Sequence, residues 1–396
     1  MPIPPSTNRP MRRLVVLLSL LFALEASLFA CIAPLLPHYA HEFALSKSAA
    51  GLLTGSYPAG VILGAFAVGR ARRLNPRTLT LIGLVVFSAA TLVFGLGREI
   101  VVLDATRVLQ GVGCGGIWGG GLAWLAKAST PANRGRSLGV TMGAGTFGTM
   151  LGPVIGTIAA AVDPRVVFGG MALVGVVLIP VVLATAAPSS SSGPTASISR
   201  VLRNSQLVVC LFVLGVPFLG GGALSVLVPL QLSRVGGTGL EVGATFFLAS
   251  ALGTLVGPLA GTLSDRRGRL LPIRIGISAG IVLVVGLCLL RTLPVVMILT
   301  IGYLGCVFGL VSSPAMALQT DLADGTEYEA AVPALQLMAI ALADLVGSSA
   351  GGALAQVTED AVTYAALALV GIAALVLLRA GVTRRLKVPL MPSGES

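Results

Sequence analysis

The sequence predicts an all-α membrane protein with twelve transmembrane helices in two six-helix bundles that repeat each other. Three observations predict it: only 10% of the 396 residues are charged while 55% are hydrophobic, the apolar residues form long runs, and the second half repeats a feature of the first. A soluble domain of this length needs a charged exterior, which so few charged side chains do not supply. A run of about 20 apolar residues crosses a bilayer as a helix, because its backbone must satisfy its own hydrogen bonds in lipid.

Twelve such runs follow one another along the chain. We expect spans at 14–36, 48–69, 78–97, 100–126, 137–161, 166–187, 206–232, 241–263, 271–290, 294–318, 331–356 and 361–379. Between the sixth and seventh runs lies PSSSSGPTASISR, a Ser/Pro/Gly-rich stretch that cannot bury a core and is typical of a flexible linker. The sequence therefore predicts an N-terminal bundle over 1–187, a cytoplasmic linker over 188–205 and a C-terminal bundle over 206–396.

A repeated loop supports the division into two bundles. The stretch GAFAVGRARR begins at Gly64 after the second span, and GTLSDRRGRL begins at Gly261 after the eighth span. The repeat distance is close to half the chain, as expected for two related sets of six spans. Two such sets packed around a central cavity are typical of secondary transporters.

The basic residues are shared unequally between the two sides of the membrane. One side holds five of the 26 Lys and Arg residues, and one more lies within a span. The five are Lys47, Arg98, Arg165, Arg234 and Arg291. Because basic loops stay in the cytoplasm, we expect both termini and the linker to be cytoplasmic, although one expected cytoplasmic loop (Asp321, Asp324, Glu327, Glu329) is acidic. The preponderance of Arg over Lys favours a GC-rich bacterial genome, and hence the bacterial inner (plasma) membrane.

The loop after the eighth span carries a charged motif. Gly261 permits close helix packing, and Asp265 can accept charge-assisted hydrogen bonds from Arg266 or Arg269 and latch the cytoplasmic side shut. This stretch resembles the G-x-x-x-D-R-x-G-R loop signature of the major facilitator superfamily, a resemblance that covers nearly the whole chain. In the first-half copy, Val68 replaces the Asp and Ala71 the Gly. The alternative is that these charges only set the topology.

A second motif places an arginine inside the fourth span. Arg107 and Gln110 belong to a stretch, RVLQG, that resembles the R-x-x-Q-G signature of proton-coupled members of the superfamily. A guanidinium within a span faces protein or water rather than lipid, so we expect Arg107 to tune a nearby carboxyl group. Asp104 lies one turn earlier and is a candidate partner. The alternative is a structural ion pair at the end of the helix.

Glycines and a proline line one face of the fifth span. Gly139, Gly148, Gly152, Pro153 and Gly156 resemble the motif of the twelve-span drug:proton antiporters, with Thr157 in place of its last Gly. Small residues permit close helix contact and proline bends the helix, so we expect a gate between the two bundles here. The alternative is that these glycines serve packing alone.

Two carboxyl groups lie near the centres of spans. Glu25 falls in the first span and Asp344 in the eleventh, where an ionised side chain is costly and is a functional candidate by default. The stretch 341–352 resembles the eleventh span of vesicular amine transporters and their bacterial multidrug relatives, with Ser312 and Ser313 where those carriers hold an Asp in the tenth span. The resemblance implies proton coupling at Asp344 and recognition of a cationic substrate at Glu25. The alternative is a protonated carboxyl group that hydrogen-bonds between helices.

The remaining candidates concern the substrate. We expect the cavity to be lined by Glu25, Gln110, Trp118, Phe246, Tyr303 and Gln336, because aromatic faces stack on aromatic or cationic molecules. His38 and His41 are expected in the first outer loop, as solvated residues. The sequence has no Walker motif, no metal-ligand cluster and no basic stripe typical of nucleic-acid binding. We therefore expect no cofactor, no metal and no enzymatic activity, and a monomer as the working unit.

Taken with the resemblance, these features predict proton-coupled export of small organic or drug-like molecules by alternating access. The expected partners are protons, the lipid bilayer and a lipophilic or cationic cargo. Export of a sugar or another metabolite, import, a non-transporting membrane sensor or lipid-handling protein, and a membrane-embedded enzyme are the alternatives that the residues leave open.

Overall fold

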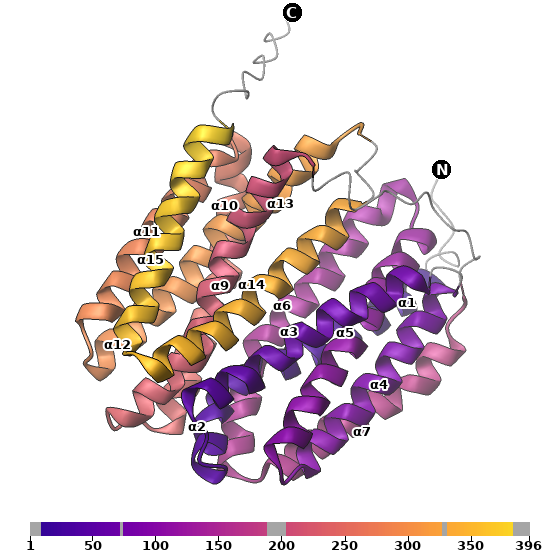
Figure 1. Ribbon diagram of the computed structural model, residues 1–396. Helices are drawn as coiled ribbons and strands as arrows, with labels where there is room; N and C mark the ends of the chain where they lie inside the picture. Colours follow the sequence, from indigo (N-terminus) through magenta and orange to yellow (C-terminus); the bar gives the residue numbers. More distant parts are fainter. Residues whose placement is uncertain (1–8, 72–73, 188–202, 327–330, 383–396) are drawn as a thin grey trace, which may run out of the picture.

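A computed structural model describes residues 9–71, 74–187, 203–326 and 331–382, and within these ranges the chain is helical with no strand. Twelve of its helices are long and apolar enough to cross a membrane, which confirms the expected fold class. Figure 1 shows them as a bundle of long rods that run side by side. The predicted linker lies almost entirely outside the described residues, and the bounds of the two bundles stay predictions.

The first six spans form what we call the N-terminal half, and the last six form the C-terminal half. The N-terminal half contains α1 (Arg9–Ala30), α2 (Ile32–Glu42), α3 (Lys47–Arg70), α4 (Pro76–Leu96), α5 (Ile100–Ala128), α6 (Pro131–Ala161) and α7 (Pro164–Ala184). The C-terminal half contains α9 (Ser205–Arg234), α10 (Gly239–Arg267), α11 (Leu270–Leu289), α12 (Leu293–Ile301), η1 (Gly302–Val307), α13 (Phe308–Ala323), α14 (Val332–Val357), α15 (Asp360–Leu377) and η3 (Leu378–Val382). The tenth span combines α12, a π-helical turn η1 and α13.

Successive spans run in opposite directions, so the connections alternate between two ends of the bundle. The connection before Arg269 lies at the same end as Arg9 and Val382, and we call it the Arg269 end. The opposite end holds the start of α3 and the start of α15, and we call it the Lys47 end.

Local capping residues set several helix boundaries. Ser46 precedes α3 and its side chain accepts a hydrogen bond of 3.2 Å from the backbone N of Ala49. Thr238 and Glu241 form a capping box at the start of α10, where each side chain binds the other residue's backbone N. Gly268 ends α10 with a φ of 87°, a left-handed conformation that glycine adopts without a Cβ penalty. These caps explain why the described spans begin and end close to the predicted ones.

The first span differs from the prediction. It breaks at Cys31 and continues as α2 to Glu42, so His38 and His41 lie on a helix rather than in a loop. Leu35, Leu36 and Tyr39 are buried on α2, and their packing extends the helix beyond the apolar run. Apolar run length alone does not mark where such a helix ends.

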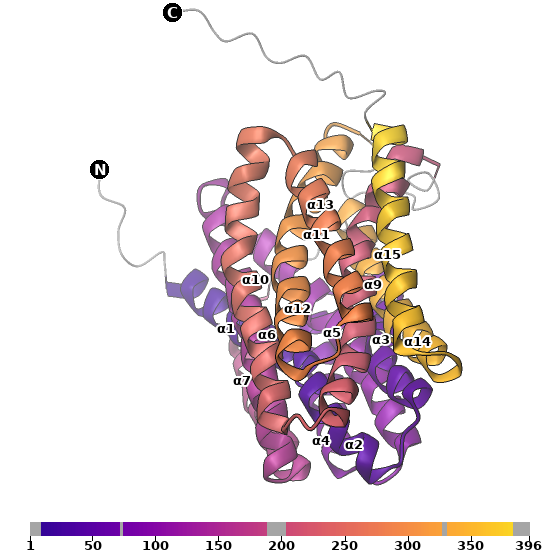
Figure 2. The ribbon, with the colours of Figure 1, turned by 90° about the vertical axis from the view of Figure 1, so that its left-hand side faces the viewer.

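Two large hydrophobic cores hold the bundle together. One gathers mainly residues of the N-terminal half, and the other gathers mainly residues of the C-terminal half. The halves meet where α3 packs against α14 and where α6 packs against α10. Figure 1 shows α3 and α14 adjacent at the centre, and Figure 2, turned by 90°, shows α10 and α6 adjacent.

Glycines reveal how closely the halves approach at each end. At the Lys47 end, a Cβ added to Gly51 of α3 would lie 2.5 Å from the backbone O of Ser348 on α14. At the Arg269 end, a Cβ on Gly139 or Gly143 of α6, or on Gly257 of α10, would meet nothing within 4 Å. A Cβ on Gly51 would therefore collide with the other half at the Lys47 end, whereas the space beside the three glycines towards the Arg269 end is open.

Candidate functional site

Glu25 lies in the second half of α1 and is only 4% exposed. The hydroxyl of Tyr57, on α3, donates a hydrogen bond to Oε1 of Glu25. The indole Nε1 of Trp118, on α5, donates a hydrogen bond of 2.6 Å to Oε2. Both oxygens of the carboxyl group thus accept a hydrogen bond from a different helix, which fixes its position and compensates for its burial.

Aromatic rings surround this carboxyl group. Trp118 stacks on Phe22 of α1 with ring centroids 4.0 Å apart and an interplanar angle of 16°. The ring of Tyr57 lies 5.2 Å from that of Phe29. Trp118 is partly exposed, so one part of its indole is accessible to a bound molecule. A carboxylate beside accessible aromatic faces is an arrangement that attracts organic cations.

Arg107 lies on α5, the helix that also carries Trp118, and is only 1% exposed. Its Nη1 donates hydrogen bonds to the backbone O of Leu28 at 3.2 Å and to Oε1 of Gln110 at 3.0 Å. The guanidinium also lies over the ring of Tyr57, 4.7 Å from its centroid. Its Nε and Nη2 have no hydrogen-bond partner within the described ranges. Among the described residues, Arg107 is therefore a buried cation that is stabilised by an aromatic ring and two carbonyl oxygens rather than by an ion pair.

The expected pairing of Arg107 with Asp104 is wrong. Asp104 accepts a hydrogen bond of 3.4 Å from Ser56 on α3, and no ion pair joins Asp104 to Arg107. The two residues are neighbours along α5, but the long Arg107 side chain extends into the core towards Leu28 and Gln110. Spacing on a helix makes such a pair feasible, and the surrounding helices decide whether it forms.

Asp344 is the second carboxyl group inside a span, and it belongs to the C-terminal half. It lies on α14, where its Oδ1 is 2.8 Å from the position that a Cβ on Gly222 of α9 would occupy. No residue that the structure describes donates a hydrogen bond to its carboxyl group, which is partly buried. Arg107 is close enough to interact electrostatically with both Asp344 and Glu25. One buried cation thus acts on a carboxyl group in each half.

The other residues expected at the cavity do not all join this group. Gln110 does, because it bridges Arg107 and, at 3.2 Å, the hydroxyl of Thr91. Phe246 and Tyr303 instead belong to the hydrophobic core of the C-terminal half. Tyr303 is 4% exposed, and its hydroxyl fills the space beside Gly220.

Gln336 is buried too, and its Nε2 donates a hydrogen bond of 3.1 Å to the backbone O of Met316. Phe246, Tyr303 and Gln336 make no hydrogen bond or ring contact with Glu25 among the described residues. An aromatic or polar residue in an apolar span satisfies the same sequence criterion whether it faces a cavity or a neighbouring helix. These three residues therefore do not join the group around Glu25, and their place in a substrate cavity stays a prediction.

The charged motif after the eighth span forms a network within the C-terminal half. Arg269 donates through Nη1 to the carboxylate of Asp265 and through Nε, at 2.9 Å, to Oδ2 of Asp321. The hydrogen bond to Asp321 raises the pKa of Arg269. Arg266 is exposed. The network joins α10 to the end of α13, two helices of the same half, and the expected role of the motif in latching the cytoplasmic side shut stays a prediction.

The glycine-rich motif of α6 faces α1 of the same half. A Cβ on Gly148 would collide with the backbone of Ala23, and one on Gly156 with the backbone O of Cys31. A Cβ on Gly152 would lie 2.5 Å from that of Ala30. Pro153 accepts a hydrogen bond of 2.8 Å from the side chain of Thr157, one turn later.

The expected gate between the bundles is thus wrong for these glycines, because their face of the helix is already filled by α1. The contact with the other half is made by Thr157, whose side chain lies against Gly243 of α10. Thr157 is the position at which this chain departs from the antiporter motif. The Thr157 side chain fills space that would be open if position 157 were a glycine facing Gly243.

Sequence reasoning missed Tyr57, Asp321 and Cys114. Tyr57 donates to Glu25 and stacks on Arg107, and the thiol of Cys114 is also a neighbour of Glu25. A lone tyrosine within an apolar span was an available signal, because a polar group at that depth needs a partner. For Asp321, the available signal was an acidic residue in a segment that was expected to be a cytoplasmic loop, on the same side as most of the arginines.

Twelve candidate membrane spans, with ionisable side chains inside the spans of both halves, are typical of a membrane transporter. The chain belongs to the Major Facilitator Superfamily, whose sequence profile matches residues 18–347. Quinolone resistance protein NorA of Staphylococcus aureus (strain MRSA252) is 27% identical over 166 residues, which are 41% of this chain and 43% of NorA. Multidrug resistance protein 1 of Bacillus subtilis (strain 168) is 29% identical over 138 residues, 35% of this chain and 36% of that protein. The chain thus matches less than half the length of these curated relatives.

Solved structures share the fold over nearly the whole chain. A bacterial homologue of the human lysosomal transporter Spinster has a TM-score of 0.69 and 15% identity, with 96% of each chain covered. A D-xylose–proton symporter has a TM-score of 0.75 and 16% identity, with 93% of this chain and 97% of that one covered. The nucleoside transporter NupG has a TM-score of 0.74 and 11% identity, with 94% and 99% covered. At these identities the likeness concerns the fold alone.

Proposed function

We propose that the protein is a proton-coupled exporter of small organic, drug-like molecules that works by alternating access. The observation that carries this proposal is the Glu25 site: a buried carboxyl group held by Tyr57 and Trp118 and flanked by stacked aromatic rings. Such a site attracts a lipophilic cation by charge and by its aromatic faces. The same carboxyl group binds a proton when the cation leaves.

Competition at one carboxyl group couples the two fluxes. Proton and cargo each lower the affinity of Glu25 for the other, so a proton gradient drives cargo out. Asp344 supplies a second proton-binding group on the other half, and Arg107 acts on both. We assign cargo recognition to Glu25, Trp118 and Gln110, and proton coupling to Glu25, Asp344 and Arg107. Asp104, which Ser56 hydrogen-bonds, is a peripheral member of this set.

The charge bias and the packing support the proposed direction of transport. The excess of Lys and Arg at the Arg269 end supports a cytoplasmic location for that end and for both termini, in a bacterial inner membrane. Helices of the two halves pack together at the Lys47 end, and the space beside Gly139, Gly143 and Gly257 is open towards the other end. This arrangement supports entry of cargo from the cytoplasm, followed by rocking of the halves about the central site. The drug-resistance relatives, which match this chain over part of their length, support the same cargo class.

A second candidate is export of a sugar or another endogenous metabolite. The fold of a D-xylose symporter and of a nucleoside transporter supports this candidate, because the same scaffold carries polar cargo in those proteins. The carboxyl group and stacked rings of the Glu25 site favour a cation over a neutral sugar. A non-transporting sensor would show no exchange of cargo at all.

Energised cells preloaded with the cargo test the proposal, because their proton gradient is directed inward across the membrane. Efflux of tetraphenylphosphonium or ethidium is expected to follow the gradient in the wild type and to fail in Glu25→Gln and in Asp344→Asn. Glu99→Gln is the matched control, because Glu99 is exposed in a connecting loop. Counterflow of labelled cargo in proteoliposomes separates a carrier from a sensor. Unchanged gradient-driven efflux in both site variants would overturn the coupling assignment.

A further inference from the structure

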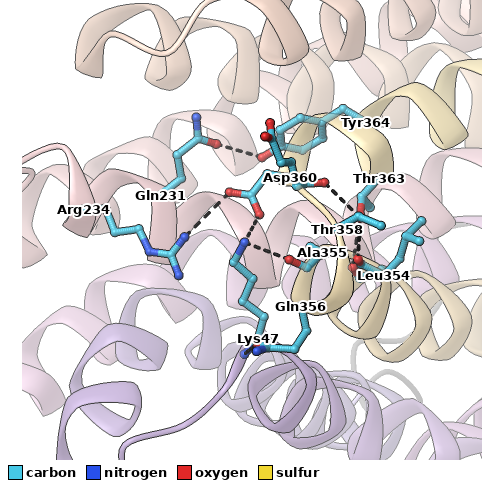
Figure 3. Close-up of polar contacts among 12 residues, drawn as sticks. Lys47, Gln231, Arg234, Leu354, Ala355, Gln356, Thr358, Asp360, Thr363 and Tyr364 are labelled. Carbon is cyan, nitrogen blue, oxygen red and sulfur yellow. Dashed lines mark hydrogen bonds and ion pairs between the residues drawn. The ribbon is translucent and has the colours of Figure 1, made fainter.

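Lys47 makes polar bonds from one half of the bundle to the other. It begins α3 of the N-terminal half, and all its partners belong to the C-terminal half (Figure 3). Its backbone N donates to Oε1 of Gln356 at 2.9 Å, and its Nζ donates to the backbone O of Ala355 at 3.0 Å and to the carboxylate of Asp360. Between two described residues, no other ion pair joins the halves.

The position of this pair at the end of α14 and the start of α15 strengthens it. Ala355 lies in the last turn of α14, where carbonyl groups lack helical partners and favour a cation such as Lys47. Asp360 is the first residue of α15, where the helix terminus favours an anion. The Lys47 and Asp360 side chains are only 13% and 20% exposed, so water screens their attraction less than it does on an open surface.

A second cation faces the same carboxylate. Nη1 of Arg234, the last residue of α9, lies 4.0 Å from Oδ2 of Asp360, while Lys47 binds Oδ1 (Figure 3). Arg234 and Asp360 belong to the same half, and the Arg234 side chain is 59% exposed and therefore free to adjust. Asp360 thus lies between two cations, one on each side of the interface.

The two cations respond differently when the halves separate at the Lys47 end. Lys47 leaves with α3, whereas Arg234 stays with Asp360. A partly buried carboxylate that loses its only counter-charge is costly, but a second cation at 4.0 Å removes most of that cost by closing to hydrogen-bond distance. We propose that Asp360 exchanges partners during the transport cycle: it binds Lys47 while the Lys47 end is closed, and Arg234 when that end opens. This proposal rests on the alternating movement of the two halves.

The other contacts between the halves at the Lys47 end cannot stabilise the closed and the open state in turn. They consist of close packing between small residues, such as Gly51 with Ser348 and Gly243 with Thr157. These contacts depend on distance and contain no charge, so they offer the open state no replacement partner. The exchange at Asp360 stabilises the closed state through Lys47 and still permits opening through Arg234.

Distances between spin labels test the exchange without cargo. Labels on Glu99 and Leu240, which are exposed at the Lys47 end on opposite halves, report separation in a background whose native cysteines are replaced. Lys47→Met is expected to raise the ratio of separated to closed molecules about tenfold, equivalent to about 1.4 kcal/mol. Arg234→Met is expected to lower that ratio, because the open state loses its partner. Each substitution is measured alone and in combination with Gly243→Ala. Because Gly243→Ala is expected to favour separation, shifts in either direction become visible.

Arg291→Met is the matched control. It breaks an ion pair of 3.4 Å with Glu359 that lies at the same end but within the C-terminal half, so the label distances are expected to stay unchanged. Lys47→Met and Asp360→Asn are expected to be non-additive, because they remove the same pair. Unchanged distances in Lys47→Met, or shifts of the same sign in Lys47→Met and Arg234→Met, would overturn the proposal. Failure of drug efflux alone would overturn the proposed function and leave these distances unaffected.

Discussion

Trp118 and Glu25 are 93 residues apart in the sequence, yet the indole Nε1 of Trp118 lies 2.6 Å from Oε2 of Glu25. The same indole stacks on Phe22, one turn before Glu25 on α1. Trp118 therefore both orients the carboxyl group and supplies an aromatic face beside it. This double role makes Trp118 a sharp test of the proposed cargo site.

Trp118→Phe keeps the ring and removes the hydrogen-bond donor. We expect the dissociation constant for tetraphenylphosphonium to rise about tenfold or more, because a hydrogen bond to a charged group contributes roughly 1.5–3 kcal/mol. Equilibrium binding to purified protein measures this change. Trp124→Phe is the control, since Trp124 lies on the same helix and donates to the backbone O of Ala186 instead. An equal loss in both variants would contradict the assignment.

Arg107→Lys keeps the charge and removes the planar group that lies over Tyr57 and donates to Leu28 and Gln110. We expect a loss of stability of about 1–3 kcal/mol, because buried groups are left without partners. The midpoint of thermal unfolding in detergent measures it. Asp104→Asn is expected to leave the midpoint unchanged, because Asp104 does not pair with Arg107. A comparable fall in Asp104→Asn would instead favour the ion pair expected from the sequence.

Gly156→Ala introduces a methyl group against the backbone of Cys31. Overpacking of this kind costs about 1–3 kcal/mol, so we expect a lower unfolding midpoint and a weaker α1–α6 contact. Gly143→Ala lies on the same helix with nothing within 4 Å, and is expected to be neutral or slightly stabilising. Equal midpoints for the two variants would show that the motif face is not packed as described.

Gly243→Ala places a methyl group against Thr157 at the contact between α10 and α6. We expect the halves to separate more often at the Lys47 end, with little loss of stability within either half. Spin labels on Glu99 and Leu240 measure the separation. Gly257→Ala, on the same helix with nothing within 4 Å, is the control. An unchanged distance distribution in Gly243→Ala would exclude Thr157 as a point of contact that resists opening.

The number of spans and the position of the buried charges could be read from the sequence. Apolar runs of membrane-spanning length give the twelve helices directly, because lipid demands an internally hydrogen-bonded backbone. Glu25, Asp344 and Arg107 stood out for a related reason: an ionisable group inside a span is costly unless protein or water surrounds it. The structure brings Glu25 and Arg107 together around Tyr57.

Only the tertiary structure decided which neighbour each helix face meets. The α6 glycines pack against α1, and Tyr303 and Gln336 pack within the C-terminal half. Asp104 accepts a hydrogen bond from Ser56, and Lys47 pairs with Asp360. Lipid is as apolar as a leucine side chain, so hydrophobicity does not distinguish a helix face that meets lipid from one that meets protein. The partner of each small or polar residue is fixed by packing between spans far apart in the sequence, and a single sequence does not record that packing.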